Sequence, residues 1–501
     1  MTAPLWLLIL LQAAISAASL IVEIVAGRMI APYVGMSLYT WTSIIAVVLA
    51  GFSVGHWWGG RLAAGPSERA MRRAGWTMLA AALVTAGASM VLRLSAGPVL
   101  SSVEEPLTAI LVLTTLAFFL PSLFAGVPAP ILAVVAMRAG EGQERALGAM
   151  FAAGAVGAIA GTLLAGFVFV SWLGSIATLA VIAAAYALAG VLCLWLGRAR
   201  AAGLGTAAGV AALTLGLCLR SLALPAVCDV ESSHYCIRTA ALAGPGEPAV
   251  NLMVIDHLAH GISGADAPRV MFTEHAAMLD ALPRMRMGTA EFSSFHIGGG
   301  SYSVPRAWAD RGIGGITVAE VDPAVTRQAV RDFWFDPGSA TVLHADARVA
   351  LARSPARYDV IVGDAFTDIA VPAHLVTAEF FTLVAERLTP DGIFAMNLID
   401  RADRLAALAA LVATLRTVFP SVEVWTEARP PDPGERRVFV LLAGAADSPV
   451  SAITAPAPDP RRFAALGPAF VDDVVQRAGG LILTDDFVPI DRLMGLDRTI
   501  D

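Results

Sequence analysis

Long uninterrupted apolar stretches occupy the first 222 residues of the chain. A helix needs about 20 mostly apolar residues to cross a bilayer. The fourth stretch holds Pro121, Pro128 and Pro130, so it is either one kinked span or a broken one. The pattern predicts a multi-span membrane domain over 1–222, with about seven spans near 5–26, 40–60, 74–92, 107–137, 146–170, 172–197 and 204–222.

Beyond residue 229 the pattern changes to short strand-like runs and amphipathic helices. Two β-rich runs, Tyr235–Arg238 and Asn251–Ile255, predict a small sheet in a β-rich domain over 229–285. From 286 to 501, strands alternate with helices, which indicates right-handed crossovers and an α/β doubly wound, Rossmann-like domain with a parallel sheet. The expected strands are 295–297, 316–319, 341–343, 358–362, 392–397, 421–426 and 437–442, and the expected helices are 304–311, 323–332, 377–388 and 402–418.

Charge divides the chain at the same place. Residues 1–222 hold 11 Arg and 6 acidic residues, whereas 223–501 hold 23 Arg and 35 acidic residues. An acidic domain is a poor partner for nucleic acid, because phosphate contacts need a basic face. All 34 basic residues are Arg, which excludes a Schiff-base lysine and a Walker-type phosphate loop.

The Arg residues predict how the spans are oriented. They gather in the loops at 61–73, 138–145 and 198–200, and Arg-bearing loops are usually cytoplasmic. With seven spans in the inner (cell) membrane, the acidic domain is then expected on the extracytoplasmic side. The side of the membrane on which this domain lies stays open.

Two cysteines and a few polar groups in the spans are candidate sites. Cys228 and Cys236 can pair if their compartment is oxidising, whereas a zinc site lacks a second close pair of Cys or His. Glu23, Arg28 and His56 lie in or near spans, where ionisable groups are costly and often functional. For Glu23 and Arg28, a structural ion pair and a transport site remain equally open.

Acidic residues follow successive strands of the predicted sheet. The first strand ends in Gly298, Gly299 and Gly300, and the next three end at Glu320, Asp346 and Asp364. Parallel strands bind ligands at their carboxyl ends, and an acid about 20 residues after such glycines suits ribose hydroxyls. Because the glycine run is not G-x-G-x-x-G, an adenosyl ligand without pyrophosphate is favoured over a dinucleotide.

The same segments resemble the spermidine synthase family of polyamine aminopropyltransferases, in particular its membrane-fused branch. The resemblance covers about 229–495 and implies a fold of the S-adenosylmethionine-dependent methyltransferase type. It is carried by the motifs HIGGG at 296–300, VAEVD at 318–322, HADAR at 344–348, YDVIVGDAF at 358–366 and LTDDFVP at 483–489.

The resemblance implies an aminopropyl transfer from decarboxylated S-adenosylmethionine to a putrescine- or spermidine-type amine, with release of methylthioadenosine. By motif, Glu320 would hold the ribose, Asp346 and Ala347 would meet the adenine, and Gly298 to Gly300 would pass beneath the adenosyl group. Asp364 matches the acid that accepts the proton of the amine. The residues expected around the acceptor are Tyr235, Asp256, His260, Glu274 and Asp368.

Departures from the family pattern leave other functions open. Ser301 stands where the family has an acid after its glycines, and Thr273 replaces a His in the motif of Glu274. One alternative is a methyltransferase or lyase that uses S-adenosylmethionine itself. A second is a transporter or sensor that binds a polyamine or adenosyl compound without turnover. A homo-oligomer is also possible, and no metal is expected.

Overall fold

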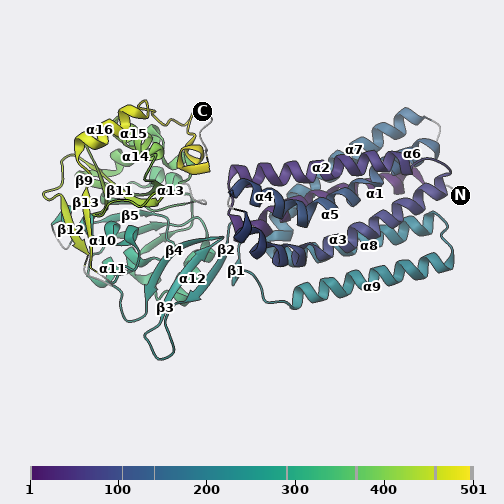
Figure 1. Cartoon of the computed structure of the whole chain (residues 1–501), viewed down its shortest axis with the longest axis horizontal. Helices are drawn as coiled ribbons and strands as arrows, with labels where there is room; N and C mark the ends of the chain where they lie inside the picture. Colours follow the sequence, from purple (N-terminus) through teal and green to yellow (C-terminus); the bar gives the residue numbers. More distant parts are fainter. Residues whose placement is uncertain are drawn as a thin grey trace. The chain divides into compact units, whose positions relative to one another are not determined.

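A computed structural model describes residues 3–103, 105–139, 142–288, 291–366, 371–455 and 460–496. By its internal contacts the chain divides into two compact units, Met1–Cys236 and Ile237–Asp501. The first unit is helical and the second is α/β (Figure 1). The expected boundaries at 222, 229 and 285 are not tested by this division and stay predictions.

Six helical stretches among the described residues are long and apolar enough to cross a membrane, which indicates a multi-pass membrane protein. Pro106–Ala139 forms a single apolar stretch of 34 residues with a π-helical turn inside it, so the fourth predicted span is kinked but continuous. The elements of this unit are α1 Leu5–Val34, α2 Leu38–Leu62, α3 Ser67–Ser102, α4 Pro106–Thr114, η1 Thr115–Phe119, α5 Leu120–Gly126, α6 Pro128–Ala139, α7 Gln143–Leu164, η2 Ala165–Val170, α8 Ser171–Leu196 and α9 Ala201–Ala223.

The apolar stretch that contains α7 and α8 is 54 residues long and consists of two helical segments. Its backbone is not helical at Gly174 (φ 75°, ψ 171°). Just before α7, Arg138 donates to the carbonyl of Gly65 (2.6 Å), and just after α8, the carbonyl of Gly197 accepts from Arg72 (2.7 Å). Both ends of the stretch therefore lie at the same end of the bundle, and the chain crosses the bundle twice here.

Glycines bring two of these helices into close contact. A Cβ atom at Gly157 would lie 2.1 Å from the carbonyl oxygen of Ala13, and one at Gly161 would lie 2.3 Å from that of Ala17. Any larger residue would therefore push α7 away from α1. Small faces of this kind let helices pack closely where lipid gives no hydrophobic drive.

A disulfide closes the segment that follows the last apolar helix. Cys228 and Cys236 are bonded, so the pairing that the sequence left open is present in the structure. Within the same unit, Arg28 of α1 donates hydrogen bonds to the carbonyls of Ser232 (2.7 Å) and His234. The guanidinium of Arg28 thus holds the disulfide-closed segment against the bundle.

The α/β unit begins with a small antiparallel sheet. β2 (Cys236–Ala241) pairs with β3 (Val250–Ile255), and β3 pairs with β4 (Leu258–Gly264). β4 was not expected from the sequence. Its polar residues and two glycines mask the alternation that identifies a strand.

A nine-stranded sheet forms the centre of this unit, in the order β12-β13-β10-β11-β9-β8-β5-β6-β7. The five strands from β9 to β7 are parallel, whereas β10 to β13 pair antiparallel. The expectation of a wholly parallel sheet was therefore wrong at this edge. The bounds are β5 Ser294–Ile297, β6 Ile316–Ala319, β7 Thr341–Leu343, β8 Tyr358–Gly363, β9 Leu388–Arg401, β10 Ser421–Glu427, β11 Arg436–Gly444, β12 Ala452–Ala455 and β13 Arg461–Ala465.

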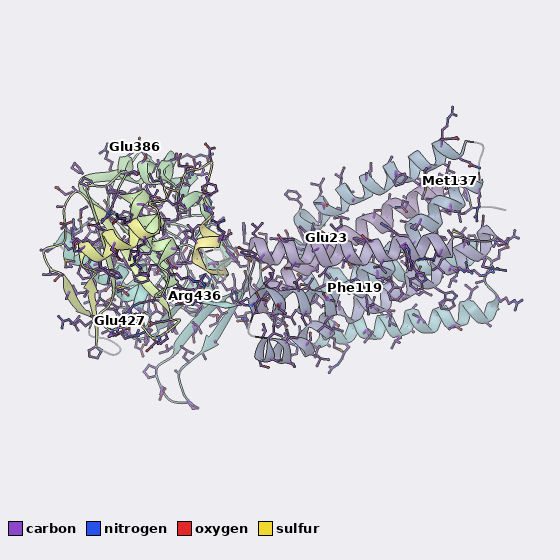
Figure 2. All side chains as sticks on the ribbon, turned by 45° about the horizontal axis from the view of Figure 1, so that its top comes forward. Glu23, Phe119, Met137, Glu386, Glu427 and Arg436 are labelled. Carbon is purple, nitrogen blue, oxygen red and sulfur yellow. A yellow bond between two sulfur atoms is a disulfide. The ribbon has the colours of Figure 1, made fainter. Side chains whose placement is uncertain are left out.

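Helices between the strands supply the rest of the core. Phe381 and Phe394 pack with their ring centroids 5.8 Å apart, and both side chains are fully buried. Figure 2 shows Glu386 at the surface of this unit, whereas Glu23 lies on a helix of the apolar unit. The helices are α10 Glu274–Met287, α11 Ser303–Asp310, α12 Pro323–Asp332, α13 Ala347–Arg353, α14 Ala378–Arg387, α15 Ala406–Leu415 and α16 Pro468–Arg477.

Candidate active site

The order of the strands makes the glycine turn a topological switch point of the sheet. β5 lies between β6 and β8, so the chain leaves β5 in one direction and β8 in the other. Ligands of open α/β sheets bind outside the carboxyl ends of strands at such a switch point. The strand ends there are Ile297, Ala319, Leu343 and Gly363, directly before the glycines, Glu320, His344 and Asp364.

The glycine turn needs its glycines. Gly298 has a positive φ of 91°, and a Cβ there would lie 2.6 Å from the carbonyl oxygen of Asp364. Gly300 also has a positive φ, of 51°. Tyr302 then closes the turn, buried and stacked on Phe335 at 4.1 Å between centroids. The turn thus places backbone without side chains at the end of β5.

Glu320 is bound to this turn. Its Oε2 accepts from the backbone N–H of Gly299 (2.9 Å) and its Oε1 accepts from that of Asp322 (2.9 Å). The residue is 6% exposed, and burial raises the pKa of Glu320 above its usual value although these amides lower it. A carboxylate has about four lone-pair sites, and the amides of Gly299, Gly300 and Asp322 use three of them, so a hydroxyl of a bound ribose can use the fourth.

Asp346 begins α13, as its position after β7 predicts. Its side chain accepts from the backbone N–H of Val349 (3.0 Å), and its second oxygen lies 2.7 Å from Nε2 of His374. Partial burial raises the pKa of Asp346, but these hydrogen bonds outweigh it, so the pKa lies below its usual value. Ala347 is the first residue of the helix and is buried.

Asp364 follows β8 and is held by a residue that the sequence did not identify. Nδ2 of Asn397, on β9, donates to Oδ1 of Asp364 (2.9 Å). Asn397 is 3% exposed, and its Oδ1 has no partner among the described residues. The only signal in the sequence was a polar residue inside an apolar strand. A buried acceptor without a partner is costly, so this atom marks a place for a ligand donor.

β4 of the small sheet meets the glycine turn. A Cβ at Gly261 would lie 2.1 Å from Oγ of Ser301, and a Cβ at Gly300 would lie 3.3 Å from the carbonyl oxygen of His260. Burial is the main cause that lowers the pKa of His260 to about 4, with smaller contributions from His275 and His257. The imidazole of His260 is therefore neutral at pH 7, and Ser301, which replaces the family's acid, lies against Gly261 of β4.

Three of the expected acceptor residues are not brought to this place by any described contact. Glu274 begins α10 and pairs with Arg461 of β13 (3.0 Å). Asp256 is buried with a positive φ of 53°, and its carbonyl accepts from Arg238. Tyr235 belongs to the first unit, where its N–H donates to Oγ of Ser232. Their roles stay predictions.

Asp368, the remaining acceptor residue, lies outside the described residues. The carboxyl-terminal motif has a structural role at Asp485, which forms two hydrogen bonds with Arg348 (2.7 Å each) and one with Thr377 (2.7 Å). The pKa of Asp485 is lowered to about 2, mainly by Arg348. This pair ties the end of the chain to α13, the helix that begins at Asp346.

His296 lies inside β5 and is a core residue. It is 2% exposed, its Nε2 lies 3.2 Å from Oγ of Ser294, and its ring meets the Trp308 ring edge-on at 5.0 Å. Burial lowers its pKa to about 3, so the ring is neutral. Among the described residues, His, Cys, Asp and Glu form no cluster that fits a metal ion.

This sheet order and its strand-end acids define a Rossmann-like domain of the methyltransferase type, preceded by apolar helices. Sequence comparison leads further: the chain is 34% identical over 130 residues to a probable polyamine aminopropyl transferase of Bifidobacterium longum. It is 32% identical over 151 residues to a polyamine aminopropyltransferase of Vibrio vulnificus. These matches confirm, over part of the chain, its resemblance to the spermidine synthase family of polyamine aminopropyltransferases.

The matches are partial. The two alignments cover 26% and 29% of this chain, and 29% and 49% of the relatives, so the chain spans less than half the length of each. An N-terminal histidine N-methyltransferase of Emericella nidulans is also similar, with 33% identity over 175 residues that cover 34% of this chain and 29% of that protein. No family model matches the chain.

Solved structures resemble the α/β unit more distantly. A probable spermidine synthase of Corynebacterium glutamicum has 21% identity and a TM-score of 0.42, covering 50% of this chain and 94% of that one. Human methyltransferase-like protein 13 in complex with SAH has 22% identity and a TM-score of 0.28, covering 41% and 88%. These values are too low to indicate a function.

Proposed function

We propose that this protein is a membrane-embedded aminopropyltransferase. It would move the aminopropyl group of decarboxylated S-adenosylmethionine to a polyamine-type acceptor and release methylthioadenosine. The observation that carries the proposal is Asp364, which follows β8 next to the glycine turn and is oriented by a buried amide of Asn397. Relatives named as polyamine aminopropyltransferases support it.

The donor would bind along the strand ends. Glu320 is fixed by the turn that would pass beneath the adenosyl group, and its remaining lone-pair site suits a ribose hydroxyl. Asp346 and Ala347 begin the next helix, where the adenine would lie. S-adenosylmethionine carries the same adenosyl group, so these contacts do not distinguish the two donors.

Asp364 would act on the acceptor. An amine attacks the carbon next to a sulfonium only when it is neutral, so a base must take its proton. A carboxylate within hydrogen-bond reach can do so. The new C–N bond forms as the C–S bond breaks, methylthioadenosine leaves with the electron pair, and the proton passes to Asp364. Asn397 would keep the carboxylate in position through its hydrogen bond.

A methyltransferase is the second candidate. Ser301 stands in place of the acid that would help bind the amine of the decarboxylated donor, and its Oγ lies against Gly261 of β4. The similarity to an N-terminal histidine N-methyltransferase supports this candidate independently. It requires the carboxylated donor and a methylated product.

The full-length protein in detergent is incubated with each donor and with putrescine, spermidine and a histidine-containing peptide. Mass spectrometry then identifies the products. We expect methylthioadenosine and an amine that is heavier by one aminopropyl group. A methylated product with S-adenosylhomocysteine would contradict the aminopropyl transfer and establish the second candidate.

Two variants separate catalysis from binding. Asp364→Asn keeps the hydrogen-bonding shape and removes the base, so we expect kcat to fall about 10²- to 10⁴-fold with little change in methylthioadenosine affinity by calorimetry. Glu320→Ala should abolish that affinity. Asp472→Asn, on the exposed surface of α16, should change neither. Unchanged turnover in Asp364→Asn would exclude Asp364 as the base.

A further inference from the structure

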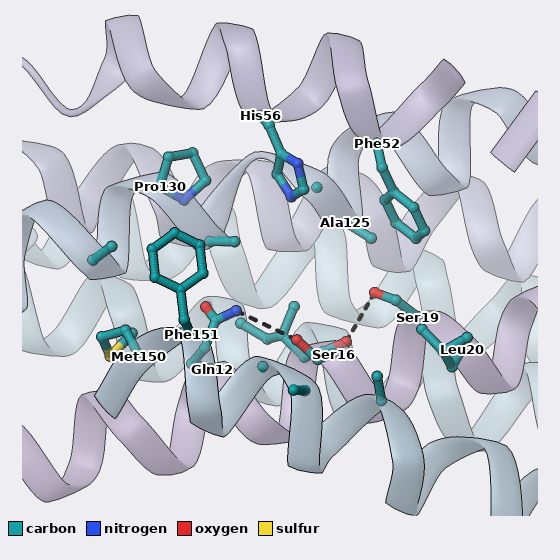
Figure 3. Close-up of a pocket in the computed structure, with 17 residues that line it drawn as sticks. Gln12, Ser16, Ser19, Leu20, Phe52, His56, Ala125, Pro130, Met150 and Phe151 are labelled. Atoms are coloured by element: carbon teal, nitrogen blue, oxygen red, sulfur yellow. Dashed lines mark hydrogen bonds between the residues drawn. The ribbon is translucent and has the colours of Figure 1, made fainter. Parts of the chain in front are cut away.

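A cavity of about 520 Å³ lies inside the apolar unit. Residues of α1, α2, α5, α6 and α7 line it, among them Phe52, Pro130 and Phe151 (Figure 3). Its walls are mainly aliphatic, aromatic or Ala and Gly residues. The cavity belongs to no part of the proposed transferase site.

A few of the side chains that line the cavity are polar. Gln12 and Ser16 of α1 line it together with His56 of α2, and Figure 3 shows Gln12 and His56 pointing into the space from opposite sides. Nε2 of Gln12 donates to Oγ of Ser16 (3.3 Å). We refer to Gln12, Ser16 and His56 as the polar group of the cavity lining.

Gln12 has an unused hydrogen-bonding atom. The residue is 8% exposed, and its Oε1 is buried without a hydrogen-bond partner among the described residues. Buried polar atoms are nearly always paired, and inside a membrane water does not supply the partner. Gly154 of α7 leaves room here, because a Cβ there would lie 3.3 Å from Nε2 of Gln12.

The lining also limits the charge of an occupant. Among the described residues that line the cavity there is no Asp, Glu or Arg. A protonated polyamine or a phosphate would enter without a counter-charge, and burying an unpaired ion is strongly unfavourable. The body of the occupant must therefore be apolar and its head uncharged.

We propose that this cavity binds an uncharged lipid alcohol that enters from the bilayer. Its hydroxyl would donate to Oε1 of Gln12, and its oxygen would accept from the imidazole of His56. The hydrocarbon body would fill the space between Phe52, Pro130 and Phe151. A hydroxyl satisfies both partners, whereas an ether or ester oxygen only accepts.

The test uses the full-length protein in phospholipid nanodiscs and a hexadecanol probe that carries a diazirine and an alkyne. After irradiation, peptides are mapped by mass spectrometry. We expect labels on α1, α2 or α7 at the cavity. Unlabelled 1-hexadecanol should compete at least about tenfold better than its methyl ether, which corresponds to about 1.4 kcal/mol.

Variants test whether the preference for the alcohol over its ether depends on the polar group of the cavity lining. Gln12→Leu keeps the size of the side chain and should remove the tenfold preference for the alcohol. Gln143→Leu makes the same change at the exposed start of α7 and should retain it. Ala158→Phe fills the cavity and should reduce labelling itself.

Equal competition by alcohol and ether, or an unchanged preference in Gln12→Leu, would overturn the proposal. Displacement of the probe by spermidine would also overturn it and would indicate an amine site. Because labelling requires no donor or acceptor substrate, a protein without transferase activity still tests this inference.

Discussion

Single carboxylates of the α/β unit differ because their surroundings differ. Glu320 is buried against backbone amides, and burial raises its pKa. Asp485 is exposed and bound to Arg348, which lowers its pKa to about 2. The first therefore suits the proposed contact with ligand hydroxyls, whereas the second holds the carboxyl-terminal segment in place.

His296 predicts how stability depends on pH. Its pKa is about 3 in the folded protein and 6.5 for an ordinary histidine, so the unfolded chain takes up a proton first as pH falls. Stability is then lost between pH 6.5 and 3, by about 2 kcal/mol at pH 5. Thermal unfolding followed by tryptophan fluorescence at pH 7, 6 and 5 measures this loss.

His296→Gln removes the titrating ring and should reduce the loss at pH 5 by about 2 kcal/mol, leaving the part that His260 causes. The matched control is His234→Gln, which changes an exposed histidine and should leave the dependence as in the parent protein. An equally steep loss of stability in His296→Gln would show that other groups cause it.

Among the elements, the glycine turn depends most directly on backbone geometry. Gly298 and Gly312 both have positive φ, 91° and 82°. Only Gly298 has a close neighbour, because a Cβ at Gly312 would meet nothing within 4 Å. The two residues therefore separate conformational strain from steric clash.

Gly312→Ala should cost about 1 kcal/mol of stability, which is the strain of a left-handed alanine. Gly298→Ala adds a contact of 2.6 Å to the carbonyl of Asp364, so it should cost more and also weaken binding of methylthioadenosine. Chemical unfolding and calorimetry measure the two effects. Equal losses of stability, with binding intact, would contradict the role of the close contact.

Helices and parallel strands followed the sequence pattern more closely than the antiparallel edge did. The predicted helix 323–332 is α12, and the predicted strand 341–343 is β7. By contrast, β9 extends over Leu388–Arg401 and pairs antiparallel with β11. An apolar run predicts that a strand is buried. The partner of that strand and the direction of the pairing depend on residues far away in the chain.

At the scale of the whole molecule, the open question is the side of the membrane. The Arg-bearing loops favour an extracytoplasmic α/β unit, and a disulfide between Cys228 and Cys236 agrees with an oxidising compartment. A reporter after Asp501 tests this: alkaline phosphatase should be active there, and green fluorescent protein should be dark. A fusion after Arg200, in an expected cytoplasmic loop, should give the reverse.

Bright fluorescence after Asp501 would contradict this orientation and would mean that one apolar stretch does not cross the membrane. It would also give the α/β unit direct access to a cytoplasmic donor. Active phosphatase would instead require that the donor or ligand reaches the unit on the outer side.

The sequence alone determined the apolar helices, the α/β alternation and the acids after successive strands, because these follow from local periodicity and from residues adjacent to a strand end. It did not identify Asn397 or the cavity at Gln12, since each depends on which segments pack together. Only the tertiary structure decided the antiparallel edge, the hydrogen bond that orients Asp364 and the placement of Glu274 beside Arg461. The physical reason is that hydrophobic burial acts on any apolar face, whereas a polar contact exists only between the groups that the fold brings together.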